Sequence, residues 1–218
     1  MRVMPKGQRV KLKREISKER VLEVAARLFR EKGYLATGTR EIAEAANMKS
    51  GSLYYHYPSK EALLSAVMTL AIEKLTDSVS QAIADTPDSE GMRGRLRNAI
   101  RAHLQVIHEH VDMMIASRQS LNLLPEESRD AHVRLRENYA QVWRELLESG
   151  KASGDVARDA DVVLIEMFLL GALNWTSEWF DPARLSFDRL SQGLMDLVLD
   201  GAGGPDGLVS RPARAVVR

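Results

Sequence analysis

A cluster of small polar and aromatic side chains lies between residues 49 and 60, in the order KSGSLYYHYPSK. Tyrosine hydroxyls and histidine nitrogens suit contacts to phosphate, and an aromatic ring can cover a thymine methyl group. Thr39 and Lys60 each fall at an expected helix N-terminus, where backbone N–H groups already favour an anion such as phosphate. The spacing predicts a DNA-contacting surface, and the alternative is a buried aromatic corner in a helical bundle. The side chains expected to face a major groove are Lys49, Ser50, Gly51, Ser52, Tyr54, Tyr55 and His56.

Two short helices must position these residues. Thr39 is the expected N-cap of a helix from 40 to about 46, and a tight connection at 47–50 leads into a second helix that ends near Pro58. This is the layout of a helix-turn-helix. Ala43 allows the two helices to cross closely because its side chain is small. The apolar contacts that hold the pair are expected from Ile42, Ala46, Met48 and Leu53.

Charge is distributed unevenly along the chain. Residues 1–60 hold 14 Lys and Arg against 6 Asp and Glu, a net charge of +8, whereas the remaining 158 residues hold 17 against 24, a net charge of −7. A local positive excess attracts polyanions such as nucleic acids. Residues 1–14 are expected to form a basic, flexible arm, which either follows the DNA or is a tail that touches nothing.

The rest of the chain shows helical periodicity, and no run alternates with a period of two, so the sequence predicts an all-α fold of about nine helices. A helix capped by Ser17 precedes the helix-turn-helix, and a longer helix capped by Ser59 follows it. The expected organisation is the basic arm (1–14), a three-helix helix-turn-helix domain (15–60), a larger helical domain (61–200) and a flexible tail (201–218).

Composition excludes several classes of protein. The chain has no cysteine, which excludes thiolate metal sites, redox dithiols and disulfide-built modules. The longest apolar stretch, 162–175, is interrupted by Glu166 and is shorter than a membrane span, and the first residues lack the apolar segment of a signal peptide. We therefore expect a cytoplasmic protein that contacts no membrane. The chain has no G-x-S-x-G, H-E-x-x-H or phosphate-binding glycine loop, so we expect neither an enzyme nor a cofactor.

The segment from about Lys18 to Met68 resembles the N-terminal domain of TetR-type transcriptional regulators. The matching motifs are AARLFREKGY (25–34), TREIAEAA (39–46) and GSLYYHYPSKEAL (51–63). The resemblance implies a three-helix DNA-binding domain followed by a larger domain for ligand binding and dimerisation, and it implies that Tyr57 is a core aromatic. Position by position it implies phosphate contacts from Thr39, Tyr54, His56 and Lys60, and contacts with or near bases from Arg40, Ser50, Gly51, Ser52 and Tyr55.

The resemblance also implies a homodimer. In TetR-type regulators the last two helices pair with those of a second subunit as a four-helix bundle, which here implies helices at about 159–179 and 187–200. These are the most apolar helices of the chain, and a monomer would cover them poorly. A two-fold dimer in turn predicts double-stranded DNA with an inverted-repeat operator as the partner.

The larger domain contains candidate contacts for a small-molecule effector, although the same residues could be ordinary core. Methionine adapts to irregular ligands, and tryptophan offers a large apolar face with one donor. A metal site is not expected, because His103 and His110 are separated by ~10.5 Å along one helix. Arg118 could pair with an acidic ligand group or with Glu126 or Glu127. The candidate ligand-binding residues are His103, Met113, Met114, Arg118, Leu121, Trp143, Met167 and Trp175.

The C-terminal segment is loosely similar to TetR-type regulators of fatty-acid and steroid catabolism, some of which respond to acyl-CoA thioesters. The effector is therefore expected to be lipid-, steroid- or acyl-CoA-like. However, those relatives tend to carry basic residues and an R-P-x-G-x-L turn where this chain has Glu178 and DPARLS (181–186). This departure argues against a CoA polyphosphate, which requires Arg or Lys nearby.

The function that the sequence supports is a homodimeric repressor that a small, largely apolar effector releases from its operator. A sequence-tolerant architectural DNA-binding dimer without an effector is the alternative, in which the basic arm dominates the affinity. A third possibility is a helical enzyme or small-molecule-binding protein whose basic N-terminus is incidental.

Overall fold

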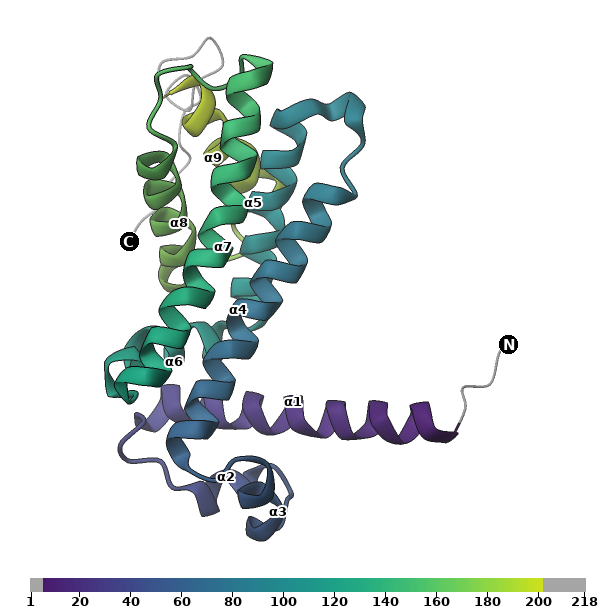
Figure 1. Ribbon diagram of the computed structural model, residues 1–218, viewed down its shortest axis with the longest axis vertical. Coiled ribbons are helices and arrows are strands. Elements are labelled where there is room, and N and C mark those ends of the chain that lie inside the picture. The colour runs from purple at the N-terminus through teal and green to yellow at the C-terminus, as the bar shows by residue number, and fades with distance from the viewer. Residues whose placement is uncertain (1–5, 202–218) are drawn as a thin grey trace. The chain divides into compact units, whose positions relative to one another are not determined.

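The computed structural model describes residues 6–201, and it describes side chains from residue 18 onward (Figure 1). Over this part of the chain all regular elements are helical, which confirms the all-α prediction of about nine helices. The α-helices are α1 (Lys6–Lys32), α2 (Thr39–Ala45), α3 (Ser50–His56), α4 (Lys60–Ala84), α5 (Gly91–Glu109), α6 (Val111–Ser120), α7 (Glu126–Ser153), α8 (Val162–Trp179) and α9 (Phe187–Asp200).

The chain forms two compact units that are interleaved in sequence. The first unit comprises the described residues through Ile72 together with His110–Leu135, and the second comprises Glu73–Glu109 and the described residues from Arg136. Helices α4 and α7 each contribute residues to both units, and α6 belongs entirely to the first. The boundary predicted at residue 60 is therefore wrong, because local sequence patterns do not reveal that α6 packs against α1.

Helix α1 begins earlier than expected. The sequence predicted an N-cap at Ser17, but the helix starts at Lys6, so the backbone from 6 to 14 is helical where a flexible arm was expected. Lys, Arg and Glu are good helix formers, and no Pro or Gly interrupts residues 8–32. Residues 1–5 of the predicted arm and residues 202–218 of the predicted tail lie outside the described residues.

The core of the first unit is built on one face of α1. Ala25, Ala26 and Phe29 are buried there. Met113 and Ala116 of α6 complete the same core, and Arg30 of α1 forms an ion pair with Asp112 of α6 at 2.5 Å. Helix α6 is therefore an integral part of the unit that carries the helix-turn-helix.

The chain leaves α1 through a defined turn. Gly33, which directly follows α1, has φ of +83°, a left-handed conformation that favours glycine. The buried Thr37 then donates its hydroxyl hydrogen toward the carbonyl oxygens of Gly33 (2.9 Å) and Leu28 (3.2 Å). These contacts fix the direction in which the chain enters α2.

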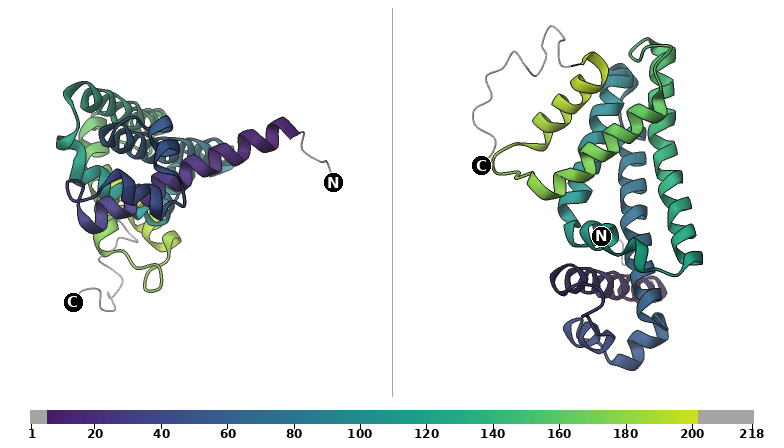
Figure 2. Two further views of the ribbon diagram at one scale, coloured as in Figure 1. Left: turned by 90° about the horizontal axis from the view of Figure 1, so that it is seen from below. Right: turned by 90° about the vertical axis from the view of Figure 1, so that its left-hand side faces the viewer.

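In the second unit, α5 packs against both α8 and α9, and α8 packs against α9 (Figure 2). The Asp161 carboxylate caps α8 by accepting from the amides of Val163 and Leu164, and Ser186 caps α9. The His108 ring meets Phe180 and Phe187 edge-on, at centroid distances of 6.1 and 5.8 Å, which ties the α8–α9 connection to α5. The largest buried apolar side chains of this unit are Leu96, Ile100, Leu104, Ile107, Trp143 and Leu147.

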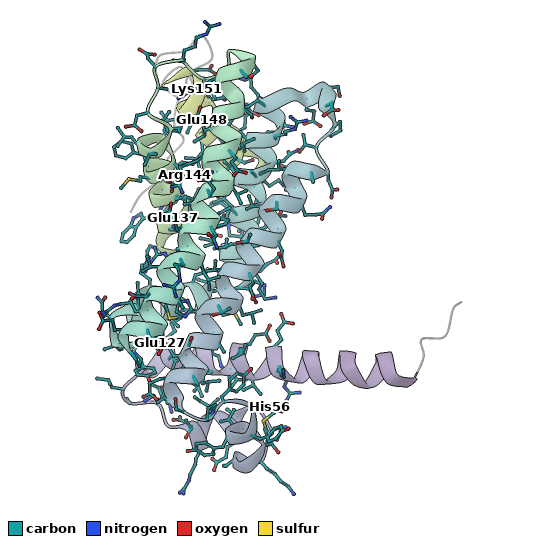
Figure 3. All side chains as sticks on the ribbon, viewed as in Figure 1. His56, Glu127, Glu137, Arg144, Glu148 and Lys151 are labelled. Atoms are coloured by element: carbon teal, nitrogen blue, oxygen red, sulfur yellow. The ribbon has the colours of Figure 1, made fainter. Side chains whose placement is uncertain are left out.

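A partly buried ion pair joins α7 to α8. Arg144 donates to the Glu166 carboxylate at 3.2 Å and also pairs with Glu137 on its own helix (Figure 3). Burial raises the pKa of Glu166, and the Arg144 charge opposes that rise. Removing Arg144 would leave a buried carboxylate without a counter-charge, which is strongly destabilising.

None of the helices in residues 6–201 is both long and apolar enough to cross a bilayer.

Candidate nucleic-acid interface and ligand-responsive unit

Helices α2 and α3 form the predicted helix-turn-helix. Helices α2 and α3 pack against each other. Ile42 and Ala43 of α2 are fully buried and Leu53 of α3 is 1% exposed, and all three belong to the core of the first unit. The turn is closed by a hydrogen bond from the Met48 amide to the Ala43 carbonyl at 2.8 Å. Asn47 occupies the left-handed region at φ of +55°, which asparagine tolerates better than most residues.

The outward face of α3 carries the predicted DNA-contacting side chains. Tyr55 is 78% exposed and Tyr54 is 45% exposed. The Tyr55 ring lies edge-on to His56, with centroids 5.2 Å apart, and His56 ends the helix (Figure 3). The other candidates in this unit are exposed or half-buried, so none contributes to the fully buried core: Thr39, Arg40, Lys49, Ser50, Gly51, Ser52 and Lys60.

A hydrogen bond links the two helices at this surface. The hydroxyl groups of Thr39, at the start of α2, and Tyr54, on α3, lie 2.7 Å apart. A phosphate contact is expected for each of these residues separately from the resemblance described above. The structure brings the two predicted contacts together, and each oxygen retains hydrogen-bonding capacity for a further partner.

Lys60 is held in place by residues that the sequence analysis missed. Its ammonium lies 4.4 Å from the centroid of the Tyr34 ring and donates to the Leu35 carbonyl at 3.3 Å. Tyr34 in turn donates its hydroxyl hydrogen to Glu61 at 3.2 Å. Burial, reinforced by the Glu61 carboxylate, raises the pKa of Tyr34 to about 12. An ammonium has three N–H donors, so Lys60 is positioned while retaining donors for a phosphate.

Glu41, in the first turn of α2, is the acidic residue closest in sequence to the Thr39 and Arg40 candidates. It forms an ion pair with Lys32 of α1, and this hydrogen bond lowers the pKa of Glu41. A carboxylate at a helix N-terminus is favoured by the helix dipole. Pairing with Lys32 offsets a negative charge that would otherwise weaken attraction to a phosphate backbone.

Gly51 has no structural requirement within the chain. A Cβ added at this position would meet no atom within 4 Å, and the backbone is not left-handed. A helical glycine without such a requirement is less stable than alanine. The absence of a side chain on the outward face of α3 therefore favours close approach by a binding partner.

We expect Gly51→Ala to leave the fold intact, to raise the free energy of unfolding by at most ~1 kcal/mol, and to weaken DNA binding on the order of tenfold. The added methyl group would hinder close approach of a duplex to the outward face of α3. Urea titration and equilibrium DNA binding on the same preparation would measure the two effects. Unchanged or tighter DNA binding would show that nothing approaches α3 at Gly51.

Two of the predicted effector contacts lie in the buried interior of the second unit. His103 and Trp143 are both fully buried, and the Nδ1 atom of His103 lies 2.6 Å from the hydroxyl of Tyr139. Burial lowers the pKa of His103 to about 3, and the Asn174 side chain of α8 offsets this lowering only in part, so the imidazole is neutral near pH 7. Sequence reasoning identified the histidine from its position on an apolar stripe, but it gave no role to Tyr139.

The structure places the other six predicted effector contacts elsewhere. Met113, Met114 and Leu121 pack with the core of the first unit, because α6 joins α1 there. Arg118 is exposed on the same helix. Met167 and Trp175 are 62% and 59% exposed on α8, so within this chain neither lines a buried interior.

Helix α8 presents an exposed apolar face. Phe168 is 70% exposed, and Gly171, between Phe168 and Trp175, would meet no atom within 4 Å if it carried a Cβ. Exposed apolar patches of this kind mark contact surfaces. The large apolar side chains of this face are Val163, Leu164, Met167, Phe168, Trp175 and Trp179.

Two protein-family models match this chain, one in its N-terminal part and one in its C-terminal part. A family model described as "Bacterial regulatory proteins, tetR family" matches residues 21–67, and one described as "Tetracyclin repressor-like, C-terminal domain" matches residues 89–202. The HTH-type transcriptional repressor KstR2 of Rhodococcus jostii is 29% identical over 85% of this chain and 90% of its own length.

Solved structures show the same similarity. The TetR family transcriptional regulator PfmR from Thermus thermophilus is 31% identical, with a TM-score of 0.72 over 83% of this chain and 97% of its own. AibR, in complex with isovaleryl coenzyme A and operator DNA, is 25% identical, with a TM-score of 0.71 over 84% of this chain and 98% of its own. The helix-turn-helix, the helical second unit and these matches together show that the chain belongs to the TetR family of bacterial transcriptional regulators.

Proposed function

We propose that the protein is a homodimeric, sequence-specific repressor that a small, largely apolar effector releases from an inverted-repeat operator. The observation that carries the proposal is the outward face of α3. There, Gly51 and Tyr55 are exposed while the neighbouring Thr39–Tyr54 pair and Lys60 are held in fixed positions. Small side chains allow close approach to base edges, and the fixed polar groups suit phosphate contacts that set the register.

The relatives support the effector class. KstR2 of Mycobacterium tuberculosis has been solved as a ketosteroid transcriptional regulator, and AibR has been solved with isovaleryl coenzyme A and operator DNA. The isovaleryl group of the AibR ligand is a short branched hydrocarbon chain, so the ligand of this relative has an apolar part. The buried interior of the second unit, formed by side chains such as Leu104 and Leu147, is chemically compatible with such a part.

The exposed face of α8 supports dimerisation. Six large apolar side chains are exposed on one helix near the C-terminus, and Gly171 in their midst allows close approach of another backbone. A second copy of the chain is the occupant we propose, because a two-fold interface places the same apolar patch on both partners. The predicted pairing through the last two helices corresponds to α8 and α9.

The interleaving of the two units supports a coupling route. Helices α4 and α7 run from one unit into the other, and the Arg30–Asp112 ion pair fastens α6 to α1 of the DNA-binding unit. We expect the effector to bind one conformation of the second unit more tightly than another. It then raises the population of that conformation, in which α4 and α6 take different positions. A coupling of ~1–3 kcal/mol would weaken operator affinity about 5–150-fold.

The proposal is tested by selecting bound sequences from a random duplex pool at near-physiological salt. We expect enrichment of an inverted repeat whose half-sites are spaced for two α3 helices on one face of the duplex. Retention of DNA without sequence enrichment would favour the architectural alternative, with its steep salt dependence. Absence of DNA binding would overturn the proposal.

Two substitutions separate sequence reading from phosphate contact. Tyr55→Ala is expected to relax the selected sequence, with a loss of about 1–3 kcal/mol against the preferred operator. Lys60→Ala is expected to weaken binding to all duplexes alike. It is also expected to reduce by about one the slope of log binding constant against log salt concentration. Competition binding with the selected operator and a scrambled duplex would measure both effects, and a Tyr55→Ala protein with unchanged preference would remove Tyr55 from the recognition surface.

A further inference from the structure

Three aromatic side chains with polar atoms cluster in the interior of the second unit. His103 comes from α5, and Tyr139 and Trp143 come from α7, one turn apart. The ring centroid of His103 lies 5.9 Å from those of both Tyr139 and Trp143, and the centroids of Tyr139 and Trp143 lie 6.3 Å apart. We refer to these residues as the His103–Tyr139–Trp143 cluster.

The cluster contains polar atoms without partners. His103 and Trp143 are fully buried, and Asn174 approaches His103 while Trp143 approaches Tyr139. Neither approach meets hydrogen-bond geometry, so the Nε2 atom of His103 and the Nε1 atom of Trp143 have no well-formed hydrogen bond among the described residues. Leaving a buried polar group unsatisfied costs about 1–3 kcal/mol, so such groups are rare in native proteins. Two of them on adjacent rings indicate a site where another molecule supplies the missing partner.

The tautomer of His103, which is coupled to its hydrogen bond with Tyr139, decides what that partner must be. If the Tyr139 hydroxyl donates to Nδ1, the neutral imidazole carries its proton on Nε2 and presents an N–H group. The Trp143 indole is a donor only. The cluster then offers two N–H donors and fits a hydrogen-bond acceptor.

The cluster is also uncharged. Burial lowers the pKa of His103 to about 3 and raises the pKa of Tyr139, so both groups are neutral near pH 7. Arg144 lies next to the cluster in the sequence of α7, but its guanidinium is paired with Glu166 and Glu137. A buried carboxylate at the cluster would therefore lack a free counter-charge and would be strongly disfavoured.

We propose that the His103–Tyr139–Trp143 cluster binds the carbonyl oxygen of an uncharged effector, such as a ketone, ester or thioester, through the N–H groups of Trp143 and His103. This inference deepens the proposed function, because it depends on the second unit being the effector-binding unit. Tyr139 is a positioning residue: its hydroxyl sets the tautomer of His103. The cluster discriminates against the free carboxylate of the same carbon skeleton.

The probes are two ketones of different shape, decan-2-one and cyclohexanone, each compared with its carboxylate counterpart, decanoate and cyclohexanecarboxylate. Protein labelled with ¹⁵N-tryptophan gives three indole N–H resonances, one for each tryptophan of the chain, and the Trp143 resonance is identified by its loss in Trp143→Phe. We expect at least one ketone to shift this resonance downfield and to bind at least about tenfold tighter than its carboxylate at a pH of about 7.5.

Trp143→Phe keeps an aromatic ring and removes the donor, so it is expected to weaken ketone binding about 3–10-fold. Tyr139→Phe is expected to weaken it similarly while the Trp143 resonance still responds. His108→Gln, which removes an exposed imidazole from the helix that carries His103, is the control and should leave binding unchanged. Circular dichroism confirms that each variant is folded.

Three outcomes would overturn the inference: neither ketone perturbs the Trp143 resonance, the carboxylates bind as tightly as the ketones, or Trp143→Phe binds the ketone normally. In the first case a buried water is the partner of the cluster. Operator binding is measured on the same samples. Loss of the ketone effect with intact operator binding would refute only this inference, whereas absence of operator binding would refute the proposed function itself.

Discussion

Phe168→Glu is expected to convert the protein to monomers and to weaken operator binding at least about 100-fold. Phe168 is the most exposed large apolar residue of α8. A two-fold interface would bury two introduced carboxylates per dimer, and burying an unpaired charge costs far more than a lost apolar contact. Without dimerisation the two half-sites are bound independently, and the gain from simultaneous binding is lost.

Analytical ultracentrifugation and equilibrium DNA binding would measure the two effects of Phe168→Glu. Val133→Glu is the matched control, since it introduces the same charge at an exposed apolar residue of α7, 53% exposed, in the first unit. The control is expected to remain dimeric. A Phe168→Glu protein that is still a dimer would show that the α8 face is not the subunit interface.

The second large effect is a loss of stability in mild acid that depends on His103. The pKa of His103 is about 3 in the folded protein and near the ordinary value of 6.5 in the unfolded chain. Between these values the unfolded state binds the proton and the folded state does not, so stability falls as the pH drops below about 6.5. At about 1.36 kcal/mol per pH unit, the loss by pH 5 is roughly 2 kcal/mol.

Urea titrations at several pH values between about 7.5 and 5 would measure this loss in the wild type and in His103→Gln. Over this interval we expect the free energy of unfolding to fall by roughly 2 kcal/mol less in the variant than in the wild type. Comparing slopes matters because the raised pKa of Glu166 acts in the opposite sense. His108→Gln removes an exposed imidazole from the same helix and serves as the control. Parallel curves for wild type and His103→Gln would contradict the prediction.

The helix-turn-helix could be predicted in detail because its signals are local. The small Ala43, the apolar Ile42 and Leu53, and the short connection each constrain φ, ψ or contacts within a few residues. The α9 bounds, the end of α1 at Gly33 and the end of α7 near Gly154 were predictable for the same reason: caps, glycines and apolar spacing act on adjacent residues.

The sequence alone could not assign each candidate effector residue to the first unit, to the interior of the second unit or to the surface. Met113, Met114 and Leu121 follow an apolar pattern equally compatible with either unit, and only the packing of α6 on α1 assigns them to the first. Met167 and Trp175 follow the same kind of pattern on α8, and only the folded chain shows that they are exposed. Apolar residues at helical spacing identify the apolar face of a helix. They do not identify which other helix, or which partner, packs against that face.

The sequence by itself determined the helical class, the position of the helix-turn-helix, the uneven charge and the family. Only the tertiary structure brought Tyr34 beside Lys60, joined Thr39 to Tyr54, and placed Tyr139 against His103 across 36 positions of the chain. The physical reason is the range of the interactions. Helix propensity, capping and turn geometry act between neighbouring residues, whereas hydrogen bonds and burial between distant helices exist only once the whole chain has packed.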